Sequence, residues 1–94
     1  MKSLIIQEDK YTPYISFDID TNQFEIAGES YSEYTLQFFE PVLEWLTGYL
    51  NQNDRPITFS FRMTYYNTST SRRFFEILKI LGSLTIFAQN SKKG

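Results

Sequence analysis

The chain has 94 residues, of which 41% are hydrophobic and 18% aromatic, and its formal net charge is -2. This length and composition predict one globular domain over residues 1–94, with enough bulky apolar side chains for a modest core. The absence of both cysteine and histidine excludes disulfides, Cys-His dyads, Ser-His-Asp triads and the usual zinc sites. We therefore expect neither a conventional hydrolase nor a bound metal or other cofactor.

The N-terminal segment MKSLIIQEDK has three consecutive apolar residues, too few for the hydrophobic region of a signal peptide. No run elsewhere approaches the roughly 20 apolar residues that span a bilayer, so we expect a soluble cytoplasmic protein without a membrane partner. Residues 1–54 hold ten acids and two bases, whereas residues 55–94 hold one acid and seven bases. Because no nucleic-acid-binding motif accompanies these bases, we expect the two halves to pair and no binding to nucleic acid.

The segment YISFDIDTNQFEIAG predicts a β-hairpin, because its apolar residues alternate with polar ones on both sides of a polar turn. We place the two strands at residues 13–18 and 23–27, connected through DTNQ. Gly28 is expected to release the chain from the sheet.

Helical spacing begins in ESYSEYTLQFFEPVLEWLTGYL, where apolar residues recur at intervals of three and four. The predicted apolar stripe consists of Leu36, Phe39, Leu43, Leu46 and Leu50. We expect one helix over residues 32–51, bent at Pro41 because proline lacks the N–H that a helix interior requires. Ser30 with Glu33 has the form of a capping box, and Ser32 is an alternative cap.

Alternation returns over residues 57–66, which predicts the longest strand, with a phenylalanine-rich face against the helices. Of the neighbours Tyr65 and Tyr66, one is expected to be buried and the other to lie near the functional surface formed by the segment that follows the strand. RRFFEILKILG then predicts a second helix over residues 69–81, ended by Gly82. LTIFAQ predicts a short last strand, and NSKKG is expected to fray.

The order of elements is therefore strand, strand, helix, strand, helix, strand. This order predicts an α+β fold, a small mixed sheet of about four strands packed against two helices.

The junction YYNTSTSRRFF concentrates four hydroxyls in residues 68–71. One interpretation is structural, because the free N–H groups at a helix start need an acceptor that Asn67 or a following hydroxyl can supply. The other is covalent modification, because a helix start carries partial positive charge and free donors that stabilise a phosphate dianion on Thr68. Arg72 and Arg73 lie about one turn further along and would offer guanidinium donors to it.

Five segments in order, TPYISFD, FEIAGESYSE, EPVLEWLTGYL, PITFSF and YYNTSTS, resemble the SiaC family of bacterial regulatory phosphoproteins from about Thr12 to Leu81. The resemblance implies a fold similar to that of anti-sigma-factor antagonists of the STAS type, a small sheet backed by helices. It also implies a switch without catalytic activity. A dedicated protein kinase phosphorylates the threonine of the Asn-Thr-Ser motif, here Thr68, and a metal-dependent Ser/Thr phosphatase removes the phosphate. The unphosphorylated form engages a target, a diguanylate cyclase in the best understood systems.

Thr68 is therefore the expected phosphorylation site. The residues expected to surround the phosphate or to bind a partner are Tyr66, Asn67, Ser69, Thr70, Ser71, Arg72 and Arg73.

Only GSLTIFAQNSKKG follows Leu81, whereas family members continue through another strand, a helix and an extended segment. We thus expect the family's usual C-terminal segment to be missing and an incomplete sheet to favour a homodimer. The alternative hypothesis is a shortened, non-switching relative that acts as a self-associating structural protein.

Overall fold

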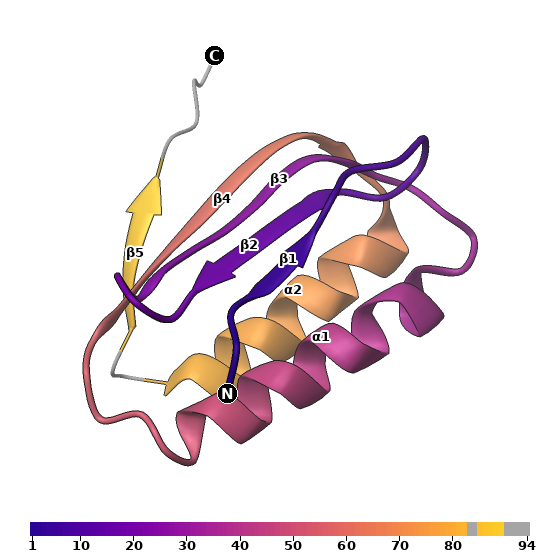
Figure 1. Cartoon of the computed structure of the whole chain (residues 1–94). Helices are drawn as coiled ribbons and strands as arrows, with labels where there is room; N and C mark the ends of the chain where they lie inside the picture. The colour runs from indigo at the N-terminus through magenta and orange to yellow at the C-terminus, as the bar shows by residue number, and fades with distance from the viewer. Residues whose placement is uncertain (83–84, 90–94) are drawn as a thin grey trace.

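The structure is a computed structural model that describes residues 1–82 and the backbone of residues 85–89. Five strands form one sheet in the order of the sequence, and two helices cover one face of it (Figure 1). The strands are β1 (Leu4–Ile6), β2 (Tyr14–Asp18), β3 (Gln23–Ser30), β4 (Ile57–Tyr66) and β5 (Thr85–Gln89), and the helices are α1 (Thr35–Leu50) and α2 (Thr68–Leu81). The predicted α+β class and order of elements are confirmed. β1 precedes them as an additional strand, whose three residues are too few to show a period. The expected fraying of NSKKG lies outside the described residues.

The sheet is mixed. β1, β2 and β3 pair antiparallel, whereas β3, β4 and β5 pair parallel. Parallel neighbours need crossover connections, which α1 supplies between β3 and β4 and α2 supplies between β4 and β5. As a result, the carboxyl ends of β3 and β4 and the first turns of both helices lie at one end of the molecule (Figure 1). Open sheets with such crossovers commonly bind ligands at this end.

β3 is longer than predicted. It continues past Gly28 to Ser30, so the prediction that Gly28 releases the chain from the sheet is wrong. Gly28 has a φ of 100° and lies at an irregularity where it pairs with Met63, while the next residue, Glu29, pairs with Tyr65. A backbone angle that favours glycine thus accommodates a β-bulge rather than a strand end.

The extra residue of this bulge is Thr64, and it reverses the side of the sheet to which the next two residues point. Tyr66 packs against Phe74 of α2, with 5.2 Å between ring centroids, while Tyr65 packs edge to face on Tyr31 at 5.5 Å. Both side chains stay exposed, Tyr65 at 54% and Tyr66 at 46%. The prediction that one of the two is buried is therefore wrong.

The core lies between the sheet and the two helices. The phenylalanine-rich face of β4 packs inward as predicted, with Ile57 and Phe59 fully buried. The other core residues are Ile15, Phe17, Phe24, Ile26, Phe39, Val42, Leu46, Tyr49, Phe74, Ile77 and Leu81. In the part of the chain that the structure describes, no helix is both long enough and apolar enough to cross a membrane.

α1 begins later than predicted, at Thr35, with Tyr34 as a cap residue that makes no side-chain capping bond. The hydroxyl of Ser32 accepts a hydrogen bond from the N–H of Tyr34 at 2.9 Å, so it stabilises the turn before the helix. Ser30 is buried at the end of β3. The predicted capping box of Ser30 and Glu33 is therefore wrong.

The buried stripe of α1 also differs from the predicted one. It consists of Thr35, Phe39, Val42, Leu46 and Tyr49. Leu36, which was expected inside, is 55% exposed. The helix runs through Pro41 without interruption.

Candidate functional site

α2 begins inside the hydroxyl cluster. Asn67 is its N-cap: the side-chain oxygen Oδ1 accepts a hydrogen bond from the N–H of Thr70 at 2.9 Å. The carbonyl oxygen of Asn67 accepts the first helical bond, from the N–H of Ser71 at 3.0 Å. Of the predicted caps, the structure selects the asparagine, and Thr68 becomes the first helical residue, one position earlier than predicted.

The four hydroxyls of this first turn differ in accessibility. Thr68 is exposed, and Ser69 and Ser71 are half-buried. Thr70 is fully buried. In this structure the side chain of Thr70 therefore offers no surface to a partner.

Thr70 instead joins α2 to the end of β3. Its hydroxyl donates to the carbonyl oxygen of Ser30 at 3.0 Å and lies 2.8 Å from the Ser30 hydroxyl. Because the Thr70 hydroxyl has a single proton, Ser30 Oγ is the donor in the second bond. The Ser30 carbonyl also accepts the N–H of Asn67 at 3.2 Å. These bonds fix the position of the cap, and therefore of Thr68, relative to the sheet.

The two arginines of α2 differ in orientation. Arg72 is exposed and follows Thr68 by four residues, which places both on one face of the helix. Helical side chains lean toward the N-terminus, so Arg72 leans toward Thr68. Arg73 lies about 140° around the helix from Thr68. Its Nε lies 3.1 Å from Oε1 of Glu76, in an ion pair without aligned hydrogen-bond geometry. Arg72, and not Arg73, therefore shares the face of Thr68.

The starts of the two helices favour an anion. Neither α1 nor α2 carries an acidic residue in its first turn, and both first turns lie at the same end of the molecule (Figure 1). Among the residues that the structure describes, nothing accepts the N–H of Thr68 or Ser69. The partial positive charge of the helix starts is thus not neutralised by a carboxylate in either turn.

An apolar hollow of about 400 Å³ lies beside the cap, between β4 and α2. It is lined by Phe61, Met63, Tyr66, Ser71, Phe74, Phe75 and Leu78. Two predicted partner-binding residues, Tyr66 and Ser71, therefore lie in this hollow. Sequence analysis missed Phe75, which is 64% exposed. The sequence does contain an indication of this exposed side chain, because Phe75 is an aromatic residue that lies outside the buried stripe of α2.

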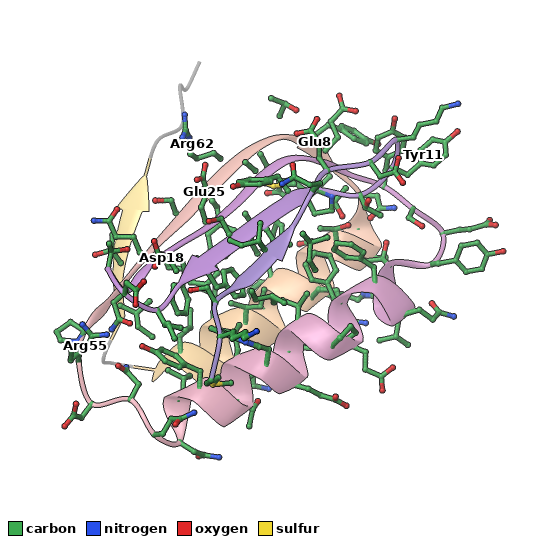
Figure 2. All side chains as sticks on the ribbon, in the orientation of Figure 1. Glu8, Tyr11, Asp18, Glu25, Arg55 and Arg62 are labelled. Carbon is green, nitrogen blue, oxygen red and sulfur yellow. The ribbon has the colours of Figure 1, made fainter. Side chains whose placement is uncertain are left out.

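The opposite face of the sheet is polar. Figure 2 shows Glu25 of β3 and Arg62 of β4 on the side of the sheet away from the helices. Arg62 Nη1 lies 3.1 Å from Glu25 Oε2, with side-chain exposures of 57% and 30%. This contact confirms, for one pair, the expected pairing of the acidic half with the basic half. An ion pair this exposed adds little to stability.

The family model described as "SiaC family regulatory phosphoprotein" matches residues 6–91. An uncharacterized protein of Pseudomonas aeruginosa (strain UCBPP-PA14) is 31% identical over 81 residues, which cover 86% of this chain and 64% of the relative. The matched region thus spans less than two thirds of that relative's length.

Two solved structures are similar over almost the whole chain. The crystal structure of apo-SiaC from Pseudomonas aeruginosa superposes with a TM-score of 0.90 at 26% identity, covering 98% of this chain and 81% of that chain. A chain in the structure of the diguanylate cyclase SiaD in complex with its activator SiaC, from the same organism, has a TM-score of 0.80 at 27% identity, covering 92% and 74%. The fold and the family match agree: the chain belongs to the SiaC family of regulatory phosphoproteins.

Proposed function

We propose that this protein is a phosphorylation-controlled binding switch whose phosphoacceptor is Thr68. The observation that carries the proposal is the accessibility of this hydroxyl. Thr68 is exposed at the first helical position, whereas its neighbours Ser69 and Ser71 are half-buried. A kinase must reach the hydroxyl that it modifies, and Thr68 offers the most access. Membership of a family of regulatory phosphoproteins supports the same assignment.

The surroundings of Thr68 suit a phosphate. The phosphate would carry a charge of about -1.5 to -2 and three acceptor oxygens. The N–H groups of Thr68 and Ser69 and the guanidinium of Arg72 are the donors that the first turn and the same helix face offer. The phosphorylated form would therefore be stabilised locally.

The unphosphorylated form is the one that we expect to bind a partner. The apolar hollow between β4 and α2 starts at Tyr66 and Ser71, which flank the cap, and reaches Phe75. A dianion on Thr68, between the lining residues Tyr66 and Ser71 in the sequence, would have to lose its hydration if an apolar partner surface closed over this region. Phosphorylation of Thr68 therefore weakens docking, and dephosphorylation restores it.

The partners follow from this cycle. A protein kinase adds the phosphate, a metal-dependent Ser/Thr phosphatase removes it, and a signalling enzyme receives the unphosphorylated form. A diguanylate cyclase is the proposed receiver, because SiaC of Pseudomonas aeruginosa is the activator of the cyclase SiaD. We place the cycle in the cytoplasm, where the nucleotide substrates of a kinase and a cyclase are available.

The test is intact-mass and fragment-site analysis of the protein recovered from its native cells. Wild type should show a gain of about 80 Da, the mass of one phosphoryl group, confined to Thr68. The gain should disappear in Thr68→Ala and persist in the control Ser69→Ala. A phosphate that stays in Thr68→Ala, or no phosphate under any growth condition, would contradict the proposal.

Self-association is the second candidate function, favoured by Phe75 at 64% exposure and Leu78 at 39%. It predicts a homodimer whose mass by light scattering is the same for wild type, Thr68→Ala and Thr68→Glu. The switch predicts instead that Thr68→Glu weakens binding to the cyclase while Thr68→Ala binds as wild type does.

A further inference from the structure

α2 carries a second stripe of side chains besides its buried one. The buried stripe consists of Thr70, Phe74, Ile77 and Leu81. The second, which we call the outer stripe, consists of Ser71, Phe75 and Leu78, at the helical spacing of four and three residues. All three line the apolar hollow between β4 and α2, and Phe75 and Leu78 are exposed at 64% and 39%. α2 therefore presents an apolar ridge to a partner.

Two cations flank the outer stripe. At 100° per residue, Arg72 and Lys79 lie about 60° and about 40° from Phe75 around the helix axis, on the same side. Both are exposed, and neither forms an ion pair with a residue that the structure describes. The acid of α2, Glu76, lies about 100° from Phe75 and contacts Arg73. The outer stripe is thus flanked by positive charge that no carboxylate on the same face of α2 balances.

Helix stability accounts for one of these cations but not for the other. Lys79 lies in the last turn of α2, where the partial negative charge of the helix end attracts a cation. Arg72 is the fifth residue of α2, near the partly positive start of the helix, which disfavours a cation. Glu76 lies four residues after Arg72 but contacts Arg73 instead. An exposed cation in an unfavourable position beside an exposed phenylalanine indicates a partner of negative charge.

The spacing of the two cations selects the shape of the partner segment. Arg72 and Lys79 are seven residues apart in α2, which is about 10 Å along the helix axis. Carboxylates at positions i and i+7 of a partner helix have the same separation and lie on one face. In an extended segment about 10 Å corresponds to three residues, and side chains three positions apart point to opposite faces. A helix therefore places two carboxylates against both cations, whereas a strand does not.

We propose that the outer stripe of α2 docks an amphipathic helix of a protein partner, with two carboxylates seven residues apart beside its apolar residues. The apolar side chains of this helix pack over Phe75 and Leu78, and its carboxylates pair with Arg72 and Lys79. The inference rests on the phosphorylation-controlled docking proposed above and adds the chemistry of the docking segment.

The same arrangement explains how phosphorylation controls docking. Thr68 lies about 20° from Phe75 around the helix axis and four residues before Arg72. A phosphate on Thr68 would take the guanidinium of Arg72 as its counter-ion. The partner's carboxylate would then lose its cation and face a dianion, so the helix would bind more weakly.

The test uses the full chain labelled with ¹⁵N and a synthetic helical peptide of alanine, glutamine and leucine. Its leucines recur at intervals of three and four, and two glutamates stand seven residues apart beside them. NMR titration should give saturable shifts at the amides of Ser71, Phe75 and Leu78. The matched peptide with lysines in place of both glutamates should bind at least about fivefold more weakly. Equal binding of the two peptides, or shifts scattered over the protein, would overturn the proposal.

A third peptide tests the spacing. Moving the second glutamate two positions further along places it on the far face of the peptide helix, about 180° from the first. This peptide has the same composition and charge, but it should bind at least about threefold more weakly, because one carboxylate no longer reaches a cation. Unchanged binding would overturn the helical docking mode.

Charge reversal on the protein is the matched test. Arg72→Glu with Lys79→Glu should reverse the preference, so that the lysine peptide binds more tightly than the glutamate peptide. The control is Lys2→Glu with Lys10→Glu, which makes the same change in net charge at exposed positions outside α2 and should keep the preference of wild type. The dispersion of the amide spectrum verifies that each variant is folded. The same change of preference in both variants would reduce the effect to net charge and would overturn the proposal.

Thr68→Glu separates the docking helix from the switch, because peptide binding is measured on the unphosphorylated chain. This variant should weaken binding of the glutamate peptide, since the new carboxylate lies four residues before Arg72. A reversed preference in the charge-reversal variant with unchanged binding in Thr68→Glu would support the docking helix and contradict control through Thr68. Shifts at the outer stripe that grow with protein concentration in the absence of peptide would assign this surface to a second copy and would overturn the proposal.

Discussion

The hydroxyl of Thr70 donates a hydrogen bond to the carbonyl oxygen of Ser30, 3.0 Å away, and so joins the first turn of α2 to the last residue of β3. Both residues are buried, Thr70 completely and Ser30 to 2% exposure. The same carbonyl receives the N–H of the cap residue Asn67. The start of the helix that presents Thr68 is therefore held by polar contacts inside the protein and not by surface contacts.

Thr70→Val should destabilise the protein. The substitution keeps the shape of the side chain but leaves the buried hydroxyl of Ser30 without its acceptor, which costs about 1–3 kcal/mol. Urea unfolding measures this cost. Ser69→Ala, in the same turn but half-buried, is the control and should stay within about 0.5 kcal/mol of wild type.

A double-mutant cycle separates the contact from general effects. Combining Thr70→Val with Ser30→Ala should recover part of the loss, because the second change removes the unpaired hydroxyl. Simple additivity of the two single changes would show that these hydroxyls do not stabilise each other.

A second polar cluster lies at the opposite end of the sheet, around Asn22. This residue is 3% exposed and has a φ of 58°, in the left-handed region. Its side-chain Nδ2 donates to the carbonyl oxygen of Pro56 at 2.9 Å, and its Oδ1 accepts from the hydroxyl of Tyr49. Asn22 thereby connects the β-hairpin turn with α1 and with the segment that leads into β4.

Two substitutions of Asn22 distinguish backbone strain from lost hydrogen bonds. Asn22→Gly keeps the left-handed backbone but leaves buried groups unpaired, at a cost of about 1–3 kcal/mol. Asn22→Ala adds about 1–2 kcal/mol of left-handed strain to the same loss. Thermal or urea unfolding of both variants gives the two contributions. Equal stability of the alanine and glycine variants would contradict the strain component.

Sequence periodicity predicts where α1 lies but not which face is buried. The predicted stripe and the observed stripe both have spacings of three and four, and they share Phe39 and Leu46. Two features of the folded protein decide which face of α1 is buried. The helix starts at Thr35, and the hydroxyl of Tyr49 donates a hydrogen bond to Oδ1 of Asn22. Neither fact is contained in the spacing.

At the candidate site, too, local features can be predicted from the sequence and long-range contacts cannot. Helix capping rules place the start of α2 within one residue, because Asn67 and the following hydroxyls are local signals. The burial of Thr70 depends instead on Ser30, forty residues earlier in the chain. The exposure of both Tyr65 and Tyr66 depends on the bulge at Thr64, which reverses an alternation that is otherwise regular. Such long-range pairings have no signature within a short window of sequence.

At alkaline pH, the pH dependence of the free energy of unfolding should reflect the ionisation of Tyr31. Desolvation raises the pKa of Tyr31 above its ordinary value. The charge of Glu29, the neighbouring Tyr11, a side-chain hydrogen bond to Glu29 and the neighbouring Tyr65 raise it further, in decreasing order. A phenol with a raised pKa contributes stability that is fully present below the unfolded pKa of about 10 and is lost as the pH rises through the folded pKa. Tyr31→Phe should remove this loss.

Titration of phenolate absorbance gives the corresponding observation. In wild type the ionisation of Tyr31 should come at a pH above the ordinary pKa of tyrosine, and this late step should be missing in Tyr31→Phe. The control Tyr34→Phe changes a 61% exposed tyrosine at the same end of the sheet and should retain the late step. A late step that survives Tyr31→Phe would assign the raised pKa to another residue.

Substitutions of the two neighbouring phenylalanines of α2 should distinguish an effect on partner binding from an effect on stability. Phe75 is 64% exposed beside the apolar hollow, whereas Phe74 is 9% exposed in the core. Phe75→Ser should leave the free energy of unfolding within about 0.5 kcal/mol of wild type, because little apolar surface is lost from the interior. Phe74→Ala should cost about 3–5 kcal/mol, because it leaves a cavity.

Binding to the diguanylate cyclase that we propose as the partner should be sensitive to Phe75, although stability is not. Phe75→Ser should weaken it about tenfold or more, as expected when an exposed aromatic anchor is removed from a docking surface. Calorimetric titration of the unphosphorylated protein measures the affinity. Leu36→Ser, on α1 at 55% exposure, is the matched control and should bind as wild type does. Equal losses in the two serine variants would place the docking surface across both helices, and no loss in Phe75→Ser would remove the apolar hollow as the docking surface.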